Sequence, residues 1–353
     1  MSVVQHRPSE ILDIATRMSK DYEGTSPRKL LSDTIYAEYY HSWSASDSDF
    51  AKHPDAKRLV REYGEYVAKT VPSLLTGAYV YHVHQDMTDV ITWAAAGLDE
   101  TVTYSPEQLP TPVGFAYFDS PILLADVRGN NLHIHGLLWG PTQSIDGDPV
   151  TAIYSFSDAY RASESPETIE ALADASMTAE DLIKLGGRLQ MQHMSYLSPG
   201  DEAGPALLEP PEGAMLSEEW IPQEYANIDR VFIAFIKLLN QTLVKTAKPQ
   251  IERHAAKRAK RQGLPQEVTT VTLRRVEYKH PDGETPDEPT PTEWSRRWIV
   301  RGHWRWQPCG PAHVLAEEDG HGGHHAHIYI NPHVKGPEDK PLVVTERVYD
   351  VSR

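Results

Sequence analysis

Apolar residues in the first seventy positions recur at helical spacing in two stretches. The first stripe comprises Ile11, Leu12, Ile14, Ala15 and Met18, and the second comprises Leu59, Val60, Tyr63, Tyr66 and Val67. Apolar positions three and four residues apart line one side of a helix, so both stretches are predicted to be helices with one buried face. The aromatic segment Tyr36–Trp43 between them is interpreted as a core seam with polar tips at the surface, a stacking platform being the alternative.

From about residue 78 the hydrophobic pattern becomes that of β-strands. The expected strands are Ala78–His84, Val113–Phe118, Ile122–Val127, Asn131–Trp139 and Ala152–Phe156. They are rich in β-branched and aromatic residues and are bounded by turn-forming Pro, Gly and Asn. A helix at about Thr88–Ala96, capped by Asp86 or Thr88, should follow the first strand. Tight turns between the later strands favour an antiparallel or mixed sheet.

Residues 157–226 form an acidic stretch punctuated by prolines. Helices are expected at Glu167–Ala175 and at Ala179–Leu185 within it. Ser198–Glu212 is rich in Pro, Gly and charged residues, so we interpret it as a surface loop.

A long central helix is predicted to begin at about Ile228. Apolar residues as far as Val244 cover much of its circumference, so this helix should be buried on more than one side. Pro249 should kink or break it, because proline lacks the amide hydrogen of a helix interior. The basic segment Arg253–Arg261 then forms a helical end, and Val268–Tyr278 is a predicted strand.

Two late segments, Trp298–Gln307 and His324–Ile330, alternate with the period of a strand, and we expect them to pair. The apolar face of the pair would hold Trp298, Val300, Trp304, Trp306, Ala326, Ile328 and Ile330. The opposite face would hold Arg301, His303, Arg305, Gln307, His325, His327 and Tyr329. Such a face suits phosphate, a metal or an acidic partner.

These elements predict an α+β fold with a helical N-terminus, a mostly antiparallel sheet, a long central helix and a C-terminal β unit. We divide the chain into an acidic domain at residues 1–226 and a second part at residues 227–353, which could also pack as one domain. Residues 1–227 carry 14 Lys and Arg against 34 Asp and Glu, whereas residues 228–353 carry 20 against 16.

The composition of the 353-residue chain is that of a globular protein, with 40% hydrophobic and 24% charged residues. Its net charge of −16 is interpreted first as a source of solubility, although a locally basic part can still bind nucleic acid. The single cysteine, Cys309, excludes an internal disulfide. No signal peptide or membrane span is expected, so we predict a soluble cytoplasmic protein of unknown oligomeric state.

Histidine is the residue type that most suggests chemistry. Three of the 17 histidine positions begin a His-x-His pair in a predicted strand, at His82, His133 and His325. Residues i and i+2 of a strand point the same way, so each pair can chelate one metal ion. The favoured pair is His325 and His327, holding Zn²⁺ or Mn²⁺, with His303 as a third ligand or proton donor. The alternative is that the chain has no cofactor and these histidines lie in a flexible region.

His325-Ala-His-Ile-Tyr-Ile330 resembles the His-hydrophobe-His motif of replication-initiator and relaxase endonucleases, and His133-Ile-His-Gly-Leu-Leu138 is a second short match. The resemblance implies that two histidines bind a divalent metal, which polarises a DNA phosphate for attack by tyrosine. That family carries its nucleophile on a downstream helix. Here Tyr349 lies in Leu342–Val351, which is predicted to be a strand.

A longer segment runs from Val300-Arg-Gly-His-Trp-Arg305 to Ile328-Tyr-Ile-Asn-Pro-His-Val-Lys-Gly-Pro337. It resembles a group of actinobacterial and actinophage proteins of uncharacterised function, as do Pro112-Val-Gly-Phe115 and the region from Asp126 to Trp139. The resemblance implies a bacterial or phage origin and no particular activity.

Basic residues of the C-terminal part provide the second candidate site. Those expected to hold nucleic-acid phosphate are Lys257, Arg258, Arg261, Arg301 and Arg305. The structural alternative is that they pair with the many carboxylates or stabilise a helix C-terminus.

Our leading hypothesis is therefore an accessory or regulatory protein whose C-terminal module contacts DNA or RNA. A metal-dependent phosphodiesterase or nuclease using the histidine pair is the enzymatic alternative. An acidic module that binds a protein partner is the third. The sequence contains no phosphate-binding loop, dinucleotide fingerprint or serine-hydrolase elbow.

Overall fold

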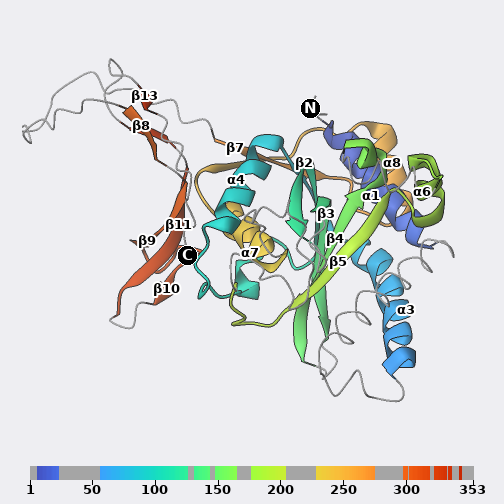
Figure 1. Cartoon of the computed structure of the whole chain (residues 1–353), viewed down its shortest axis with the longest axis horizontal. Helices are drawn as coiled ribbons and strands as arrows, with labels where there is room; N and C mark the ends of the chain where they lie inside the picture. Colours follow the sequence, from blue (N-terminus) through green and yellow to red (C-terminus); the bar gives the residue numbers. More distant parts are fainter. Residues whose placement is uncertain are drawn as a thin grey trace, which may run out of the picture. The chain divides into compact units, whose positions relative to one another are not determined.

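The computed structural model of the chain divides into two compact units, Met1–Leu273 and Arg274–Arg353 (Figure 1). The structure describes residues 6–23, 56–125, 131–143, 148–164, 176–203, 228–274, 297–300, 302–318, 322–331, 333–335 and 342–343. The division at Leu273 differs from the predicted boundary at residue 226, because the central helix and the strand after it belong to the first unit. No helix among the described residues has the length and apolarity to cross a membrane.

A seven-stranded sheet organises the first unit. In spatial order it consists of β5 (Leu189–Leu197), β4 (Pro149–Asp158), β3 (Asn131–Gln143), β2 (Gly114–Ala125), β1 (Tyr79–Val83), β7 (Val268–Leu273) and β6 (Val244–Ala247). Strand β1 is parallel to both of its neighbours, and the remaining pairs are antiparallel. The predicted α+β class and the mostly antiparallel sheet are therefore confirmed.

Helices cover both faces of this sheet. On one side lie α1 (Pro8–Glu23), α3 (Ala56–Leu75) and α8 (Arg253–Arg261), and on the other lie α4 (Gln85–Ala96) and α7 (Ile228–Leu239) (Figure 1). The predicted stripe of α1 is buried against Val80 and Phe115 of the sheet. On the opposite face, Trp139 packs against Phe232 and Phe235 of α7. The second predicted stripe does form a helix, but Tyr66 is 49% exposed.

Helix α7 is buried on nearly all sides, as its apolar composition predicts. It ends at Leu239, whereas the sequence suggested continuation to Val244, which instead begins strand β6. Two cations of α7, Arg230 and Lys237, are buried. Arg230 donates from Nε to the carbonyl of Ala95 at the end of α4. The guanidinium thus caps α4, since the last carbonyls of a helix lack helical partners.

Strand β2 is continuous where the sequence predicted two strands. Its pairing with β3 shifts between Tyr117 and Ile122, so the intervening residues form a bulge. Pro121 lies in this bulge and has no amide hydrogen to give to the ladder, which favours an irregular strand at this position. The bulge carries Asp119, and it is the most consequential irregularity of the sheet.

The acidic stretch between residues 157 and 226 contains one predicted helix and one strand that was not predicted. Helix α6 (Ala179–Gly186) forms as predicted and begins with a capping box between Thr178 and Asp181. Strand β5 was not predicted, because its polar-apolar alternation lies within an otherwise polar region. The predicted helix Glu167–Ala175 and the aromatic segment Tyr36–Trp43 lie outside the described residues.

The second unit contains two three-stranded sheets. One holds β10 (Glu317–Glu318), β11 (His324–Ile330) and β9 (His303–Pro308), and the other holds β12 (His333–Lys335), β8 (Arg297–Val300) and β13 (Leu342–Val343). The predicted pairing of the two late segments is confirmed for β9 and β11, which are antiparallel. The first segment is nevertheless split, because Trp298–Val300 belong to β8 of a different sheet.

The predicted faces of the β9–β11 pair are wrong by one residue of register. Trp306 lies opposite His327 and Trp304 lies opposite Tyr329, and directly opposed residues share a face. Trp306 stacks on His325, with ring centroids 5.5 Å apart. The aromatic rings therefore lie among the imidazoles. His303, Arg305 and Gln307 share the other face with Ile330, Ile328 and Ala326.

A candidate metal centre on the central sheet

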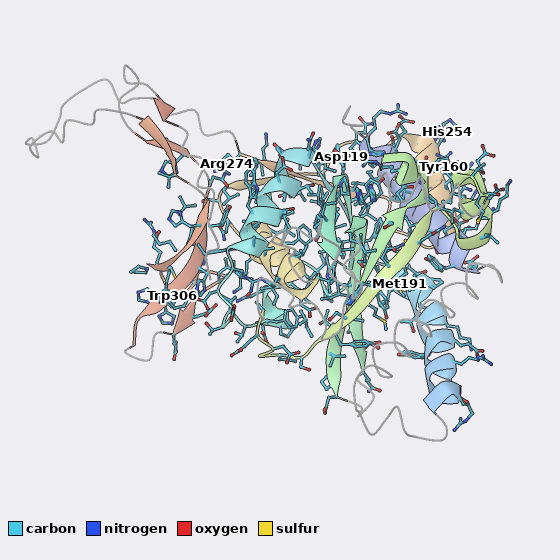
Figure 2. The ribbon with its side chains drawn as sticks, viewed as in Figure 1. Asp119, Tyr160, Met191, His254, Arg274 and Trp306 are labelled. Carbon is cyan, nitrogen blue, oxygen red and sulfur yellow. The ribbon has the colours of Figure 1, made fainter. Side chains whose placement is uncertain are left out.

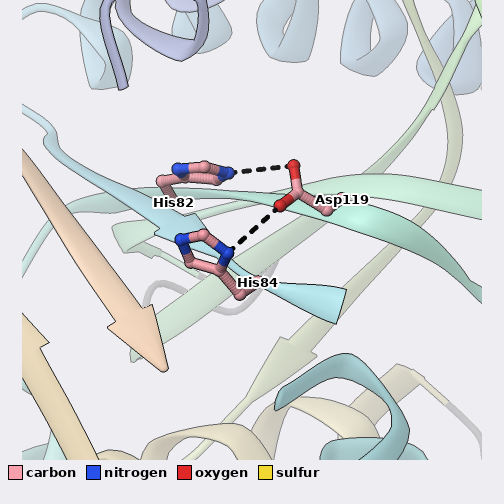
Figure 3. Close-up of side chains that lie close together, drawn as sticks. All are labelled: His82, His84 and Asp119. Carbon is pink, nitrogen blue, oxygen red and sulfur yellow. Dashed lines mark hydrogen bonds and ion pairs between the residues drawn. The ribbon is translucent and has the colours of Figure 1, made fainter. Parts of the chain in front are cut away.

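The candidate site lies where β1 ends beside the bulge of β2. His82 is in β1, His84 immediately follows that strand, and Asp119 is in the bulge. His82 shares the face of Val80, which is the face covered by α1. Both imidazoles reach toward the Asp119 carboxylate (Figure 3). Among the described residues, these three form the group of potential metal ligands.

The three side chains have the spacing of a metal site. His82 Nε2 lies 2.9 Å from Asp119 Oδ1, and His84 Nδ1 lies 3.6 Å from Asp119 Oδ2. One potential ligand atom from each residue lies within 4.8 Å of the others. Nitrogen and oxygen ligands about 2.1 Å from a tetrahedral ion lie roughly 3.4 Å apart. Binding would therefore need only a small inward movement of the side chains.

Several polar atoms at this centre are buried without a hydrogen-bond partner among the described residues. The side chains of His82 and Asp119 are 0% exposed, and that of His84 is 28% exposed. Asp119 Oδ2, His82 Nδ1 and Thr270 Oγ1 are buried without a hydrogen-bond partner among the described residues. Thr270 is the neighbour of His82 in β7. Buried polar atoms without partners cost roughly 1–3 kcal/mol each, so this cluster indicates space for a ligand or ion.

The ionisation of the centre favours metal binding near neutral pH. Burial, reinforced by nearby His82, lowers the pKa of His84, so its imidazole is neutral and has a lone pair to donate. Burial alone would raise the pKa of Asp119, but hydrogen bonds from His6 and His82 outweigh it and lower that pKa. A neutral imidazole and an ionised carboxylate are the forms that bind metal.

His6 holds the carboxylate from the side of α1. Its main-chain nitrogen lies 3.3 Å from Asp119 Oδ1, and its Nδ1 lies 3.2 Å from the same oxygen. The His6 ring also packs edge to face against the Tyr117 ring, and the two ring centroids lie 5.1 Å apart. His6 lies two residues before the start of α1 at Pro8, so docking of this helix fixes the orientation of the candidate ligand. Such outer partners orient the ligands of a metal and raise its affinity.

A buried ion-pair network adjoins the centre on β2 and β4. Asp158 accepts from Arg188 Nη2 at 2.8 Å and from the Tyr117 hydroxyl at 2.8 Å. Arg188 stacks over the Tyr160 ring at 4.9 Å. Tyr160 belongs to η2 (Ala159–Glu164), and it lies toward the same end of the sheet as Asp119 (Figure 2). The next residue, Arg161, donates from Nη1 to the Asp119 carbonyl.

Sequence reasoning found part of this centre. His82 and His84 formed one of the three His-x-His pairs, and the structure brings them together with a centroid distance of 4.7 Å. Asp119 was missed, because it lies 37 residues from His82 and an isolated aspartate carries no local signal. The only related signal in the sequence is Pro121, because a proline inside a predicted strand region indicates irregular pairing nearby. In the pair at His133, the ring of His135 is buried and lies in the Asp158 network.

The favoured histidine pair of the sequence analysis lies in the second unit. His325 and His327 of β11 lie beside Trp306 of β9, and the ring centroid of His327 lies 4.5 Å from that of Trp306. The candidate catalytic residue His303 is exposed and lies on the opposite face of the strand pair. Metal binding by His325 and His327 stays a prediction, whereas the predicted grouping with His303 on one face is not observed.

The predicted nucleic-acid-binding residues do not form one cluster within either unit. Lys257, Arg258 and Arg261 are exposed on α8 of the first unit, and Arg258 is paired with Asp13 of α1. Arg305 is exposed on β9 of the second unit, and Arg301 lies outside the described residues. Their role in binding nucleic acid stays a prediction.

Comparison with known proteins leaves the chain without an assigned family. No protein-family model and no curated protein matches it. A solved structure with similarity is the crystal structure of AcrVA2, which is 13% identical over 90% of this chain and 96% of that chain, with a TM-score of 0.34. Similarity at this level supports no conclusion about function.

Proposed function

We propose that this protein is a metal-dependent hydrolase, with His82, His84 and Asp119 holding one divalent transition-metal ion. One observation carries the proposal. Two imidazoles at the end of β1 and a fully buried carboxylate of β2 converge within 4.8 Å, and one carboxylate oxygen has no hydrogen-bond partner in the part of the chain that the structure describes. An ionised carboxylate in such a place is costly unless a cation or donors compensate it.

The donor set indicates which ions fit. Imidazole nitrogen suits Zn²⁺ and other first-row transition metals, whereas Mg²⁺ and Ca²⁺ prefer oxygen ligands. Catalytic zinc sites also have three protein ligands, for example two histidines and one carboxylate, and they keep a fourth position for water or substrate. We therefore propose Zn²⁺ or Mn²⁺ at this centre.

A fourth coordination position of the bound ion would allow it to promote hydrolysis. A divalent ion lowers the pKa of bound water toward neutrality and polarises an electrophilic substrate. The water oxygen would form the new bond, and the leaving group would depart with its electron pair and take up a proton. The 28% exposure of the His84 side chain leaves this edge of the centre open to solvent.

The proposal is tested by titrating metal-depleted protein with Zn²⁺ and Mn²⁺ in a calorimeter. One ion should bind per chain, and His84→Ala should weaken binding by at least about 100-fold, since it removes a ligand. The partly exposed His84 should be dispensable for folding, which circular dichroism and thermal melting would verify. His254→Ala is the matched control, because His254 is exposed on α8.

Wild-type protein that takes up neither ion would refute the proposed centre. Equal affinities of the wild type and the His84→Ala variant would place any bound ion elsewhere. A second ion that survives in His84→Ala but disappears in a His325→Ala/His327→Ala variant would instead support the pair on β11.

A second proposed activity, nucleic-acid contact, is favoured by the exposed face of α8. Its buried residues are Ala255 and Ala259, whereas Lys257, Lys260 and Arg261 are exposed. These three make no ion pair with the described residues. Cations on one helical face can follow a phosphate backbone, and each phosphate contact adds about 0.9 to the slope of log affinity against log salt.

This second proposal is tested with double-stranded DNA and RNA at low salt. The Lys257→Ala/Lys260→Ala/Arg261→Ala variant should bind more weakly and lower the salt slope by roughly two to three. A Lys20→Ala/Lys69→Ala/Lys245→Ala variant is the control, because it removes the same charge from exposed positions elsewhere. Identical binding by the two variants would reject a specific role for α8.

A further inference from the structure

Thr270 lies beside the candidate metal centre and is not one of its three potential ligands. It belongs to β7 and is the register partner of His82 in β1. The residues two positions earlier in the two strands, Val268 and Val80, are both buried in the core cluster that contains the apolar stripe of α1. Residues i and i+2 of a strand point the same way, so Thr270 and His82 share the face covered by α1.

The two ring nitrogens of His82 point in different directions within the sheet. Strand β1 lies between β2, which carries Asp119, and β7, which carries Thr270. Nε2 of His82 reaches the Asp119 carboxylate at 2.9 Å, and Nδ1 points away from that carboxylate (Figure 3). The Nδ1 edge of the imidazole therefore lies on the side of β7.

Two buried polar atoms on this side of the ring are unsatisfied. His82 Nδ1 and Thr270 Oγ1 have no hydrogen-bond partner within the described ranges, and the His82 side chain is 0% exposed. Buried polar atoms are normally hydrogen-bonded, and each one left unpaired is destabilising. Rotation of a threonine about its Cα–Cβ bond moves Oγ1 between staggered positions while the backbone stays in place. A bond between the two atoms would satisfy both.

Metal binding determines what Nδ1 of His82 has to do. An imidazole that gives its Nε2 lone pair to a metal carries its single proton on Nδ1, and ligating histidines almost always donate that N–H to an acceptor. In the metal-free state Nε2 donates to Asp119 instead, so Nδ1 has the lone pair. A hydroxyl has one donor and two lone pairs. Thr270 can therefore donate to Nδ1 in one state and accept from Nδ1–H in the other.

Neighbouring polar groups are directed elsewhere. Thr272 is the next residue of β7 on this face, and its hydroxyl donates to the carbonyl of Lys245. His6 approaches the carboxylate of Asp119, which belongs to the strand on the other side of β1. Thr270 is thus the hydroxyl that the sheet places next to His82 Nδ1.

We infer that Thr270 is a positioning residue of the proposed metal centre, and that its hydroxyl accepts the Nδ1–H of His82 when the ion is bound. This hydrogen bond holds the imidazole in the tautomer and orientation in which Nε2 coordinates the metal. The inference rests on the proposed function and adds a residue that touches neither ion nor substrate. Thr270 acts only through His82.

The test measures Zn²⁺ affinity in variants of the full-length protein. Thr270→Val should weaken binding about 10–100-fold, because valine has the shape of threonine without the hydroxyl. Thr270→Ser keeps the hydroxyl and should bind within about threefold of wild type. Thr269→Val is the matched control, because Thr269 is the adjacent residue of β7 and points to the opposite face of the sheet. It should bind as wild type does.

A spectroscopic measurement distinguishes positioning from packing. In Zn²⁺-loaded protein labelled with ¹⁵N-histidine, His82 should show a protonated Nδ1 and a metal-bound Nε2. Its Nδ1–H proton should resonate upfield in Thr270→Val, because the hydrogen bond is lost, and should return to the wild-type position in Thr270→Ser. A change of packing alone would leave that proton resonance unchanged.

Unchanged Zn²⁺ affinity in Thr270→Val, or an unchanged Nδ1–H resonance, would overturn the role of Thr270. If Thr270→Val does not fold, Thr270→Ala and Thr270→Ser decide, because they differ only in the hydroxyl, and equal affinities of these two would reject the role. The two proposals fail differently. Wild-type protein that binds neither Zn²⁺ nor Mn²⁺ would refute both. Binding that is lost in His84→Ala but intact in Thr270→Val would refute only the positioning role.

Discussion

His82 and Asp119 are joined by a 2.9 Å hydrogen bond between two fully buried side chains. The donor is the imidazole Nε2 and the acceptor is Oδ1, whereas Oδ2 has no hydrogen-bond partner among the described residues. Coordination of a metal ion by Nε2 would require the ring proton to lie on Nδ1, which has no hydrogen-bond partner among the described residues.

The first prediction concerns the pH dependence of metal binding. Protons compete with the metal for His84 and Asp119, and the pKa of each is lowered in the folded protein. Affinity should therefore be constant from about pH 8 to about pH 7 and should fall only below the ordinary histidine value of about 6.5. Calorimetric titrations at several pH values measure this. A steep loss of affinity already between pH 8 and pH 7 would contradict it.

The second prediction concerns the Arg188–Asp158 ion pair, whose carboxylate is 0% exposed. Arg188→Ala should lower the free energy of unfolding by about 3–5 kcal/mol, because it leaves a buried carboxylate without its cation. Urea denaturation measures the loss. Asp158→Asn/Arg188→Ala should be less unstable than the sum of the two single variants. Strict additivity would show that the pair is not coupled.

The third prediction concerns a glycine that makes room for an indole. A Cβ atom at Gly114 would lie 2.1 Å from Trp139 Cζ2, whereas a Cβ at Gly310 would meet no atom within 4 Å. Gly114→Ala should therefore destabilise the first unit by several kcal/mol, beyond the roughly 1–3 kcal/mol of ordinary overpacking. Gly310→Ala should leave the melting temperature nearly unchanged. Similar melting temperatures for both variants would contradict the packing of β2 against β3.

The fourth prediction concerns Asp229 in the first turn of α7, whose pKa burial raises to about 6. Between its unfolded value of about 3.9 and this value, the folded chain keeps a proton that the unfolded chain has lost. Stability from this group is present below about pH 4 and is lost as pH rises toward 6. Asp229→Asn should therefore raise the free energy of unfolding at pH 7.5 by about 1–3 kcal/mol.

Thermal melts at pH 4 and pH 7.5 test the sign. The gain from Asp229→Asn should shrink at pH 4, where the wild-type carboxyl is protonated as well. Glu62→Gln, at an exposed residue paired with Arg58, is the control and should show little change at either pH. A destabilised Asp229→Asn variant at pH 7.5 would show that the ionised carboxylate is stabilised by its surroundings.

Local periodicity determined the parts of the fold that depend on neighbours in sequence. The stripe of α1, the apolar circumference of α7 and the alternation of β11 each follow from repeating positions within one element. The end of α7 was not predictable in this way, because Val244 is as compatible with a helix as with a strand. Its pairing with Leu273 of β7 decided the outcome.

The faces of the β9–β11 pair illustrate the same limit. Alternation shows which residues of one strand share a face, but the register between strands decides which faces coincide. A shift of one residue placed Trp306 beside His327 instead of beside Ile328.

The sequence by itself determined the α+β class and the common direction of His82 and His84, because both depend on local geometry. Only the tertiary structure decided that Asp119 is their partner, that His6 orients it, and that Arg161 donates to its main-chain carbonyl. These contacts arise from the bulge in β2, the docking of α1 and the placement of η2. Chain segments far apart in sequence meet there through packing, and no local pattern records which polar residues packing will bring together.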